Sequence, residues 1–303
     1  MASIRRCAAS LNANLEARTE KSEHTDLDVP EGDTIFRSAQ TLHRALTGQA
    51  VTRFESVFPR LTRVDADHPI AGRTIDRVEA RGKHLLIWIG SDLVLRTHMR
   101  MHGSWHIYRP GERWQAPRRD MRIIIETAVI HAIAFRVPVA EFTTAEGLRL
   151  LPALRDLGPD PLSPAFDEHA ATDRLLALGE TEIADALLDQ RAIAGIGNVY
   201  KSEALFAGRV NPFIAVGALP REQVARLVAV AARLLRANVA PGTPAGIATY
   251  SGFRRTTRRD DPAARLWVYG RGGQPCRRCG TPISRRKQGP HARTTYWCEA
   301  CQT

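Results

Sequence analysis

The alternation of hydrophobic and polar positions changes its period along the chain. From Pro30 an apolar stripe with helical spacing runs to Gly48 and predicts an amphipathic helix. Between residues 51 and 142 the period shortens to two or to wholly apolar runs, separated by turn residues. These runs cover residues 74–80, 85–89, 93–98, 105–108, 122–126 and 129–135. Short strands at this spacing predict a β-sandwich flanked by the first helix.

The helical period returns after residues 152–164, a segment with four prolines that predicts an interdomain linker. Apolar spacing then indicates helices around residues 183–188, 199–206 and 221–237. Between the first two of these helices lies a glycine-rich turn, and Asn198 is expected to be the N-cap of the second. The fold class is therefore expected to be α+β.

The chain has 303 residues, more than a single hydrophobic core normally supports, so several domains are expected. We expect a disordered extension over residues 1–29, a β-sandwich over 30–151, a helical domain over 162–250 and a small cysteine-bearing unit over 265–303. The composition, 25% charged and 44% hydrophobic, excludes a wholly disordered chain. Neither a membrane span nor a secretory signal is recognisable, which predicts a cytoplasmic protein without a membrane partner.

The net charge of +11 and the pI near 10.1 point to a polyanionic partner. From residue 251 to the end, twelve Arg and Lys residues face three acidic residues, so much of the excess lies in the last sixth of the chain. A solvated basic face is the alternative interpretation, and nucleic acid is the favoured one.

The cysteines near the C-terminus form two Cys-x2-Cys pairs separated by 18 residues. This spacing is typical of two knuckles that bind one tetrahedral zinc ion. Two disulfides or a redox pair are the alternatives, and an intracellular location disfavours the disulfides. The predicted ligands of one structural Zn²⁺ are Cys276, Cys279, Cys298 and Cys301.

Three other positions combine a functional interpretation with an ordinary structural one. The turn before Asn198 directs backbone N–H groups and a helix N-terminus to one place, which suits a phosphate, although such turns also serve packing alone. Pro30 and Glu31 have the composition of an ordinary helix start. Lys83 lies at a strand end, where a surface charge and a phosphate contact are both possible.

Taken together, the motifs resemble the formamidopyrimidine-DNA glycosylase and endonuclease VIII family, and most closely its actinobacterial endonuclease VIII-like branch. The resemblance runs from Pro30 to the C-terminus. The motifs that carry it occur in order as Pro30-Glu31-Gly32-Asp33-Thr34, Arg81-Gly82-Lys83, Leu157-Gly158-Pro159-Asp160-Pro161-Leu162, Leu187-Leu188-Asp189-Gln190 through Gly195-Ile196-Gly197-Asn198, Val268-Tyr269-Gly270-Arg271, and the four cysteines with Tyr296-Trp297-Cys298. This resemblance implies a helix-two-turn-helix domain and a zinc ribbon after the sandwich.

The resemblance also implies a bifunctional DNA glycosylase with β,δ-elimination lyase activity. In this family the N-terminal proline attacks C1′ of the damaged nucleotide and forms a Schiff base. The implied roles are Pro30 as nucleophile, Glu31 as acid/base, Lys83 and Asn198 as contacts to the DNA backbone, Arg293 in δ-elimination, and Met101 as the wedge that fills the space of the extruded base, with Arg100 and His102 beside it. The expected partner of this monomer is double-stranded or partly single-stranded DNA with damaged bases, in a bacterial nucleoid.

Two departures from the family pattern affect these roles. Residues 1–29 place the nitrogen of Pro30 in an amide, so we expect translation to begin at Val29, which a GTG start codon would encode, with removal of the initiator methionine. If the extension is retained, the alternative function is binding of damaged DNA without catalysis. The Arg-Arg-Phe triad that probes the opposite strand is not recognisable around residues 135–138, which favours oxidised pyrimidines as substrates.

Overall fold

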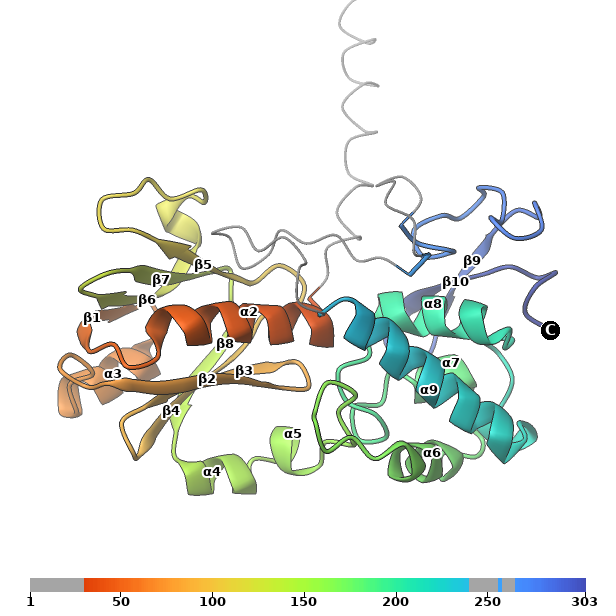
Figure 1. The fold of residues 1–303 in the computed structure, drawn as a ribbon, viewed down its shortest axis with the longest axis horizontal. Coiled ribbons are helices and arrows are strands. Elements are labelled where there is room, and N and C mark those ends of the chain that lie inside the picture. The colour runs from red at the N-terminus through yellow and green to blue at the C-terminus, as the bar shows by residue number, and fades with distance from the viewer. Residues whose placement is uncertain (1–29, 240–255, 258–264) are drawn as a thin grey trace, which may run out of the picture.

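A computed structural model describes residues 30–239, 256–257 and 265–303 of the chain. The expected disordered extension, Cys7 within it, and the last residues of the expected helical domain, 240–250, lie outside the described residues. The described part forms two groups of elements side by side, one rich in strands and one helical (Figure 1). The predicted boundaries at residues 151 and 162 stay predictions.

Two four-stranded antiparallel sheets build the first group, in the strand orders β1-β6-β7-β5 and β2-β3-β4-β8. The strands are β1 Val51–Ser56, β2 Ile75–Arg81, β3 His84–Ile89, β4 Leu93–His98, β5 Ser104–Tyr108, β6 Met121–Thr127, β7 His131–Phe135 and β8 Val139–Thr143. Sequence periodicity predicted six of them and missed β1 and β8. Both are edge strands whose residues are largely half-buried or exposed, so their hydrophobic pattern is weak.

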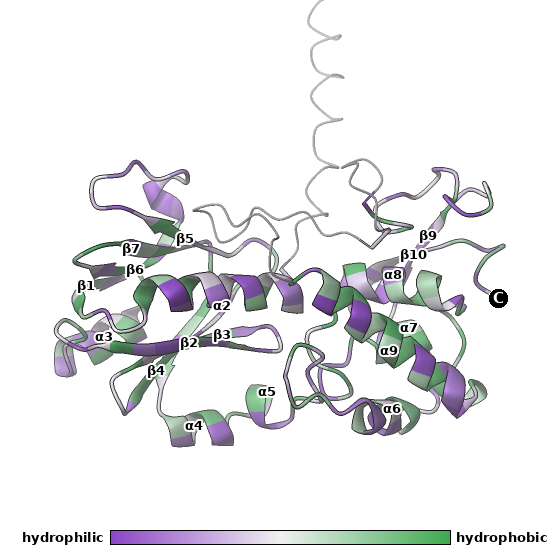
Figure 2. Ribbon diagram, viewed as in Figure 1, coloured by the Kyte–Doolittle hydropathy of each residue, from purple (hydrophilic) through white to green (hydrophobic). Residues whose placement is uncertain are grey.

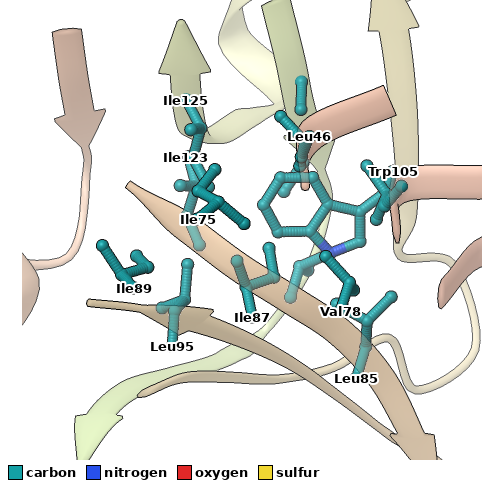
Figure 3. Packing of buried hydrophobic residues seen from close by; sticks show 14 of the residues in the cluster. Leu46, Ile75, Val78, Leu85, Ile87, Ile89, Leu95, Trp105, Ile123 and Ile125 are labelled. Atoms are coloured by element: carbon teal, nitrogen blue, oxygen red, sulfur yellow. The ribbon is translucent and has the colours of Figure 1, made fainter. Parts of the chain in front are cut away.

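The core of this group lies between the sheets and under helix α2 (Gly32–Leu46). The indole of Trp105 is fully buried beside Leu46, Val78 and Ile87 (Figure 3), and its Nε1 donates to Thr97 Oγ1 at 3.2 Å. Helix α2 contributes the predicted stripe, with Ile35, Ala39, Leu42 and Leu46 all buried. Helix α3 (Pro59–Asp67) was missed because Leu61 is its only buried residue. A 3-10 turn, η3 (Arg118–Asp120), precedes β6.

The helical group follows two short helices that pack on the sandwich. The two short helices are α4 Ala145–Leu150 and α5 Pro152–Arg155. The helical group consists of α6 Glu168–Leu176, α7 Ile183–Ala186, α8 Asn198–Gly208, η4 Val216–Ala218 and α9 Arg221–Ala237. The predicted linker thus contains a helix, α5, because Pro152 occupies the first helical position, where proline is favourable. Helix α9 matches its predicted bounds, and hydrophobic and hydrophilic residues alternate along its ribbon (Figure 2).

A hairpin of β9 (Ser284–Gln288) and β10 (Arg293–Trp297) ends the chain and packs against α8. Fully buried Glu203 of α8 fastens the segment before the hairpin, because its carboxylate accepts N–H bonds from Trp267, Val268 and Tyr269 at 2.8–2.9 Å. Burial raises the pKa of Glu203. The expected α+β fold, with sandwich, helical domain and zinc ribbon, is confirmed. None of the helices described here is long and apolar enough to cross a membrane.

Replacing Trp105 with alanine is expected to lower the free energy of unfolding by about 3–5 kcal/mol, because a fully buried indole between two sheets leaves a cavity. Chemical denaturation measures this change. Val129→Ala is the matched control, since Val129 is 52% exposed and should change stability by less than about 0.5 kcal/mol. A loss below about 1 kcal/mol for Trp105→Ala would show that the sheets close over the gap.

Candidate active site at the domain junction

The two domains meet where the start of α2 touches the turn before α8. The Gly32 amide donates to the Gly195 carbonyl at 2.9 Å. A Cβ on Gly32 would lie 2.9 Å from the Gly195 Cα, so only glycine permits this approach. Gly195 itself has a φ of +83°, in the left-handed region. The sequence motifs around residues 30–34 and 195–198 are therefore in direct contact, although 163 positions separate Gly32 from Gly195 (195 − 32).

Glu31 crosses this junction with its side chain and is 1% exposed. Its carboxylate accepts hydrogen bonds from three backbone amides at the start of α8: Gly197 at 3.0 Å, Val199 at 2.8 Å and Tyr200 at 3.3 Å. These are N–H groups that a helix cannot satisfy internally, and the helix dipole favours negative charge at this place. A Cβ on Gly197 would lie 2.4 Å from Glu31 Cδ, so Gly197 leaves the space that the carboxylate fills.

The prediction that Asn198 is the N-cap of α8 is wrong. Gly197 occupies the N-cap position, and Asn198 is the first helical residue. The cap oxygen comes instead from Glu31, which replaces a local side chain. Asn198 is thereby free to point elsewhere, and its Nδ2 donates to the Thr294 carbonyl of β10 at 2.9 Å. Its Oδ1 is buried and has no hydrogen-bond donor among the described residues.

Lys83 reaches the same turn from the sandwich. It follows Gly82, which has a φ of +56° in the tight turn between β2 and β3. The Gly82 amide donates to Asp160 Oδ2 at 2.8 Å, and Lys83 Nζ donates to the Ile196 carbonyl at 2.6 Å. Gln190 supports the turn from the other side, because its Nε2 donates to the same carbonyl at 2.9 Å. The ammonium of Lys83 is therefore held near Glu31 by fixed partners.

The loop between β4 and β5 places Met101 at the junction. Met99 is buried in the sandwich core and anchors the loop, whereas Met101 faces the cleft. Arg100 has a φ of +53°, and its amide donates to His98 Nδ1 at 3.1 Å. Burial, together with the charges of Arg100 and Lys83, lowers the pKa of His98 to about 4. At neutral pH the ring is neutral, so its nitrogen can accept this bond.

A series of polar side chains, His84, Arg96 and Glu141, supports His98. His84 contacts His98 edge to face, with ring centroids 4.8 Å apart. Burial and the neighbouring His98 lower the pKa of His84 to about 3, and its Nδ1 lies 3.0 Å from Arg96 Nη1. Arg96 in turn donates to Glu141 at 2.8 Å. This cluster is neutral at its two histidines and fixes the base of the Met101 loop.

Arg293 enters from the C-terminal hairpin as the first residue of β10 and is exposed. Its Nη1 lies 3.6 Å from the Met101 sulfur, so the hairpin and the sandwich loop touch. Seven predicted site residues line one cleft of about 830 Å³: Pro30, Glu31, Lys83, Arg100, Met101, Asn198 and Arg293. Pro30 itself is buried and lies two residues before the start of α2. The structure therefore brings together residues from the sandwich, the helical domain and the C-terminal hairpin.

The four predicted zinc ligands also converge. All four sulfur atoms lie within 4.8 Å of one another, with Cys276 and Cys301 4.0 Å apart and Cys279 and Cys298 3.4 Å apart. A tetrahedral zinc with bonds of about 2.3 Å requires sulfur atoms about 3.8 Å apart, so the residues fit this ion. Zinc at this position joins the two knuckles and stabilises the hairpin that carries Arg293.

Sequence reasoning missed three residues that shape the site: Gln190, Asp160 and Lys201. Gln190 and Asp160 lie inside motifs that were recognised, but the motifs alone do not show that Gln190 holds the glycine turn at Gly195 and that Asp160 holds the turn at Gly82. Lys201 is one of only four lysines in the chain, so its rarity among 43 basic residues was the available signal. It is fully buried in α8, behind the cleft.

Comparison with protein families gives three matches that follow one another along the chain. Residues 29–138 match the formamidopyrimidine-DNA glycosylase N-terminal domain, and residues 157–249 match the formamidopyrimidine-DNA glycosylase H2TH domain. Residues 273–303 match the zinc finger found in FPG and IleRS. The four cysteines lie within this last match, and they hold one structural zinc.

Two curated relatives are similar over nearly the whole chain. A probable endonuclease 8 2 of Streptomyces coelicolor is 43% identical, covering 90% of this chain and 94% of that protein. The DNA-(apurinic or apyrimidinic site) lyase Nei2 of Mycolicibacterium smegmatis is 40% identical, covering 91% and 99%. Among solved structures, Lactococcus lactis Fpg in complex with abasic-site DNA has a TM-score of 0.74 at 25% identity, covering 91% of this chain and 99% of that one.

Removal of zinc is expected to release the hairpin, because four converging thiolates fold this small unit only around a metal. Metal analysis should find one zinc per chain, and Cys298→Ala should lose it and weaken DNA binding. The melting transition of the sandwich should be retained. Thr303→Ala at the exposed chain end is the control. Freshly purified protein that binds DNA without any zinc would contradict this role.

Proposed function

Because the chain belongs to the formamidopyrimidine-DNA glycosylase and endonuclease VIII family, we propose that it excises damaged bases from DNA and cleaves the resulting abasic strand as a lyase. One observation carries this proposal. Pro30, Glu31, Lys83 and Arg293, which come from three parts of the chain, line a single cleft between the domains. DNA held across this cleft would meet a secondary amine, a carboxylate and two cations at one point.

In this mechanism Pro30 is the nucleophile. Its free secondary amine attacks C1′ of the damaged nucleotide, the bond from C1′ to the base breaks, and the sugar ring opens to an iminium Schiff base. Loss of a proton from C2′ then expels the 3′ phosphate in β-elimination, and a second elimination expels the 5′ phosphate. Covalent catalysis thus divides the cleavage into steps with accessible barriers.

Glu31 can act on the sugar without leaving its place in the fold. A carboxylate offers about four acceptor positions, and the α8 amides occupy three of them. The remaining position can exchange a proton with the sugar oxygen while the amides hold the side chain fixed. Because Glu31 follows Pro30 directly, the same contact places the amine and the acid/base side by side.

The cations and the amide around the cleft suit the DNA backbone. Lys83 and Asn198 would contact phosphates beside the lesion, and Arg293 would neutralise the phosphate that leaves in δ-elimination. The extruded base leaves a gap in the stack, which Met101 would fill with Arg100 beside it. Met101 lies beside Arg293 in the lining of the cleft and is anchored through buried Met99, which supports a wedge role.

The active form in this proposal begins at Pro30. An amide nitrogen is not nucleophilic, so residues 1–29 must be absent from the catalytic protein. Initiation at Val29 with removal of the initiator methionine would produce that terminus. The match to the N-terminal family domain begins at residue 29, which supports this start. If the extension remains attached, the same fold would bind damaged DNA without cutting it.

Oxidised pyrimidines in double-stranded or partly single-stranded DNA are the proposed substrates, at the bacterial nucleoid. The segment where the formamidopyrimidine branch carries its opposite-strand triad supports this choice. Arg136 there has a φ of +52° and donates to Asp120 from both Nε and Nη2, at 2.8 and 2.7 Å. A guanidinium engaged in this ion pair is not positioned to probe an opposite base.

Borohydride trapping tests the nucleophile. Protein beginning at Pro30 is expected to become covalently linked to abasic or oxidised-pyrimidine DNA, because reduction freezes the Schiff base at C1′. Protein that retains residues 1–29 should bind DNA without trapping through Pro30. If the longer protein traps equally well, with its mass shown to be intact, Pro30 is not the nucleophile and Lys83 is the next amine to test.

Glu31→Gln should lower the rate of base excision about 100- to 10,000-fold, since it removes acid/base help. It should also reduce stability by about 1–3 kcal/mol, because an amide NH2 would face buried N–H donors of α8. Glu222→Gln on the exposed start of α9 is the matched control. Single-turnover excision and thermal melting measure the two effects, and unchanged excision would remove Glu31 from the mechanism.

A further inference from the structure

Lys201 is a buried ammonium that the mechanism above does not use. It lies in α8, its side chain is 0% exposed, and it does not belong to the lining of the cleft. No carboxylate oxygen of the described residues lies within 4.0 Å of its Nζ. Burial lowers its pKa to about 8, which reflects the cost of removing this charge from water. An apolar side chain at position 201 would avoid that cost. A buried lysine is therefore expected only where its ammonium makes a hydrogen bond that an apolar side chain cannot make.

The ammonium begins a directed series of hydrogen bonds into the C-terminal hairpin. Lys201 Nζ donates to Thr295 Oγ1 at 2.7 Å, and Thr295 Oγ1 donates to Gln288 Oε1 at 2.7 Å. Gln288 Nε2 donates to Glu182 Oε2 at 2.6 Å and to the Pro212 carbonyl at 3.1 Å. Lys201, Thr295 and Gln288 are all buried, and Glu182 at the end of the series is half-buried. The series connects α8, β10, β9 and the helical domain.

These bonds hold the closed end of the hairpin. Gln288 is paired with Arg293 in the last rung of the β9–β10 ladder, and residues 289–292 form the turn between them. Gly289 has a φ of +70°, and a Cβ there would lie 2.3 Å from Asp185 Oδ1. The turn is therefore packed directly against α7, and Arg293 leaves it toward the cleft.

A second bond from the same face of α8 reaches the neighbouring residue of β10. Asn198 and Lys201 are three positions apart and so lie one above the other on the helix. Asn198 Nδ2 binds the Thr294 carbonyl, and Lys201 binds the Thr295 hydroxyl. The positive charges of Lys201 and Arg293 also repel each other, which disfavours a guanidinium folded back onto α8. Two successive residues after Arg293 are thus fixed to one helix.

We propose that Lys201 is a positioning residue for Arg293, because its bond to Thr295 fixes the end of β10 from which the guanidinium reaches the cleft. The inference rests on the proposed function, in which Arg293 assists δ-elimination. Lys201 does not line the cleft, so its loss is expected to affect the second elimination more than Schiff-base formation. Displacement of Arg293 by about 1 Å is enough to slow an assisted step about 100-fold.

The experiment removes the Lys201–Thr295 bond from each side, in the form of the protein that traps with borohydride. Lys201→Met keeps the length of the side chain without the charge, Thr295→Val keeps the shape without the hydroxyl, and Thr295→Ser retains the hydroxyl. The ratio of δ- to β-elimination products on abasic-site DNA should fall about 10- to 100-fold in the first two and recover in the third. The trapping rate should change less than about twofold, and the double variant should resemble the single ones.

Arg293→Gln distinguishes the proposed role of Arg293 in δ-elimination from the proposed role of Lys201 in positioning it. If it leaves the product ratio unchanged, the proposed role of Arg293 is wrong and the inference is overturned with it. If it lowers the ratio while Lys201→Met and Thr295→Val do not, the inference alone is overturned. If Lys201→Met and Thr295→Val both lose trapping, zinc and δ-elimination in parallel, the inference is overturned, because Lys201 then stabilises the fold as a whole and does not specifically position Arg293. A selective loss of δ-elimination in Lys201→Met and Thr295→Val, with normal zinc content, supports the positioning role of Lys201.

Discussion

The carboxylate of Glu31 binds the helical domain at the centre of the junction between the two domains. The first amides of α8 need acceptors, and Glu31 supplies them from the opposite domain through a space that Gly197 leaves open. Because Pro30 precedes Glu31 in sequence, the contact that closes the helix also brings the amine into the cleft. The arrangement of the two domains and the proposed catalytic geometry therefore depend on the same contact, and a change in one affects the other.

Helix α8 binds both the start of the sandwich and the C-terminal hairpin. Its start receives Glu31, its Asn198 and Lys201 hold β10, and its Glu203 binds the backbone that leads to the hairpin. Gln302 adds a bond from the last residues to the Val210 carbonyl at 3.0 Å. A buried carboxylate, a buried ammonium and an amide on one helix thus set the positions of elements that are distant in sequence.

The sequence predicts the elements of this protein better than the contacts between them. Period-two and helical spacing identify α2, α9 and the central strands, whereas the edge strands β1 and β8 and the mostly exposed α3 have little apolar signal. Four cysteines at fixed spacing reveal the metal ligands directly. The cap on α8 was assigned to Asn198 because capping rules are local, and only the fold brings Glu31 to that place.

The contact between Glu31 and α8 also sets the earliest point in synthesis at which the site can begin to form. Glu31 and the Gly197 amide are separated by 166 positions in the sequence, an interval that includes the whole sandwich. A ribosome that adds about 5–20 residues per second needs roughly 8–30 s to produce that interval. During this time the sandwich can fold, but its proline faces no partner surface. In the proposed mechanism, the nascent chain therefore carries its nucleophile long before it has a site in which to use it.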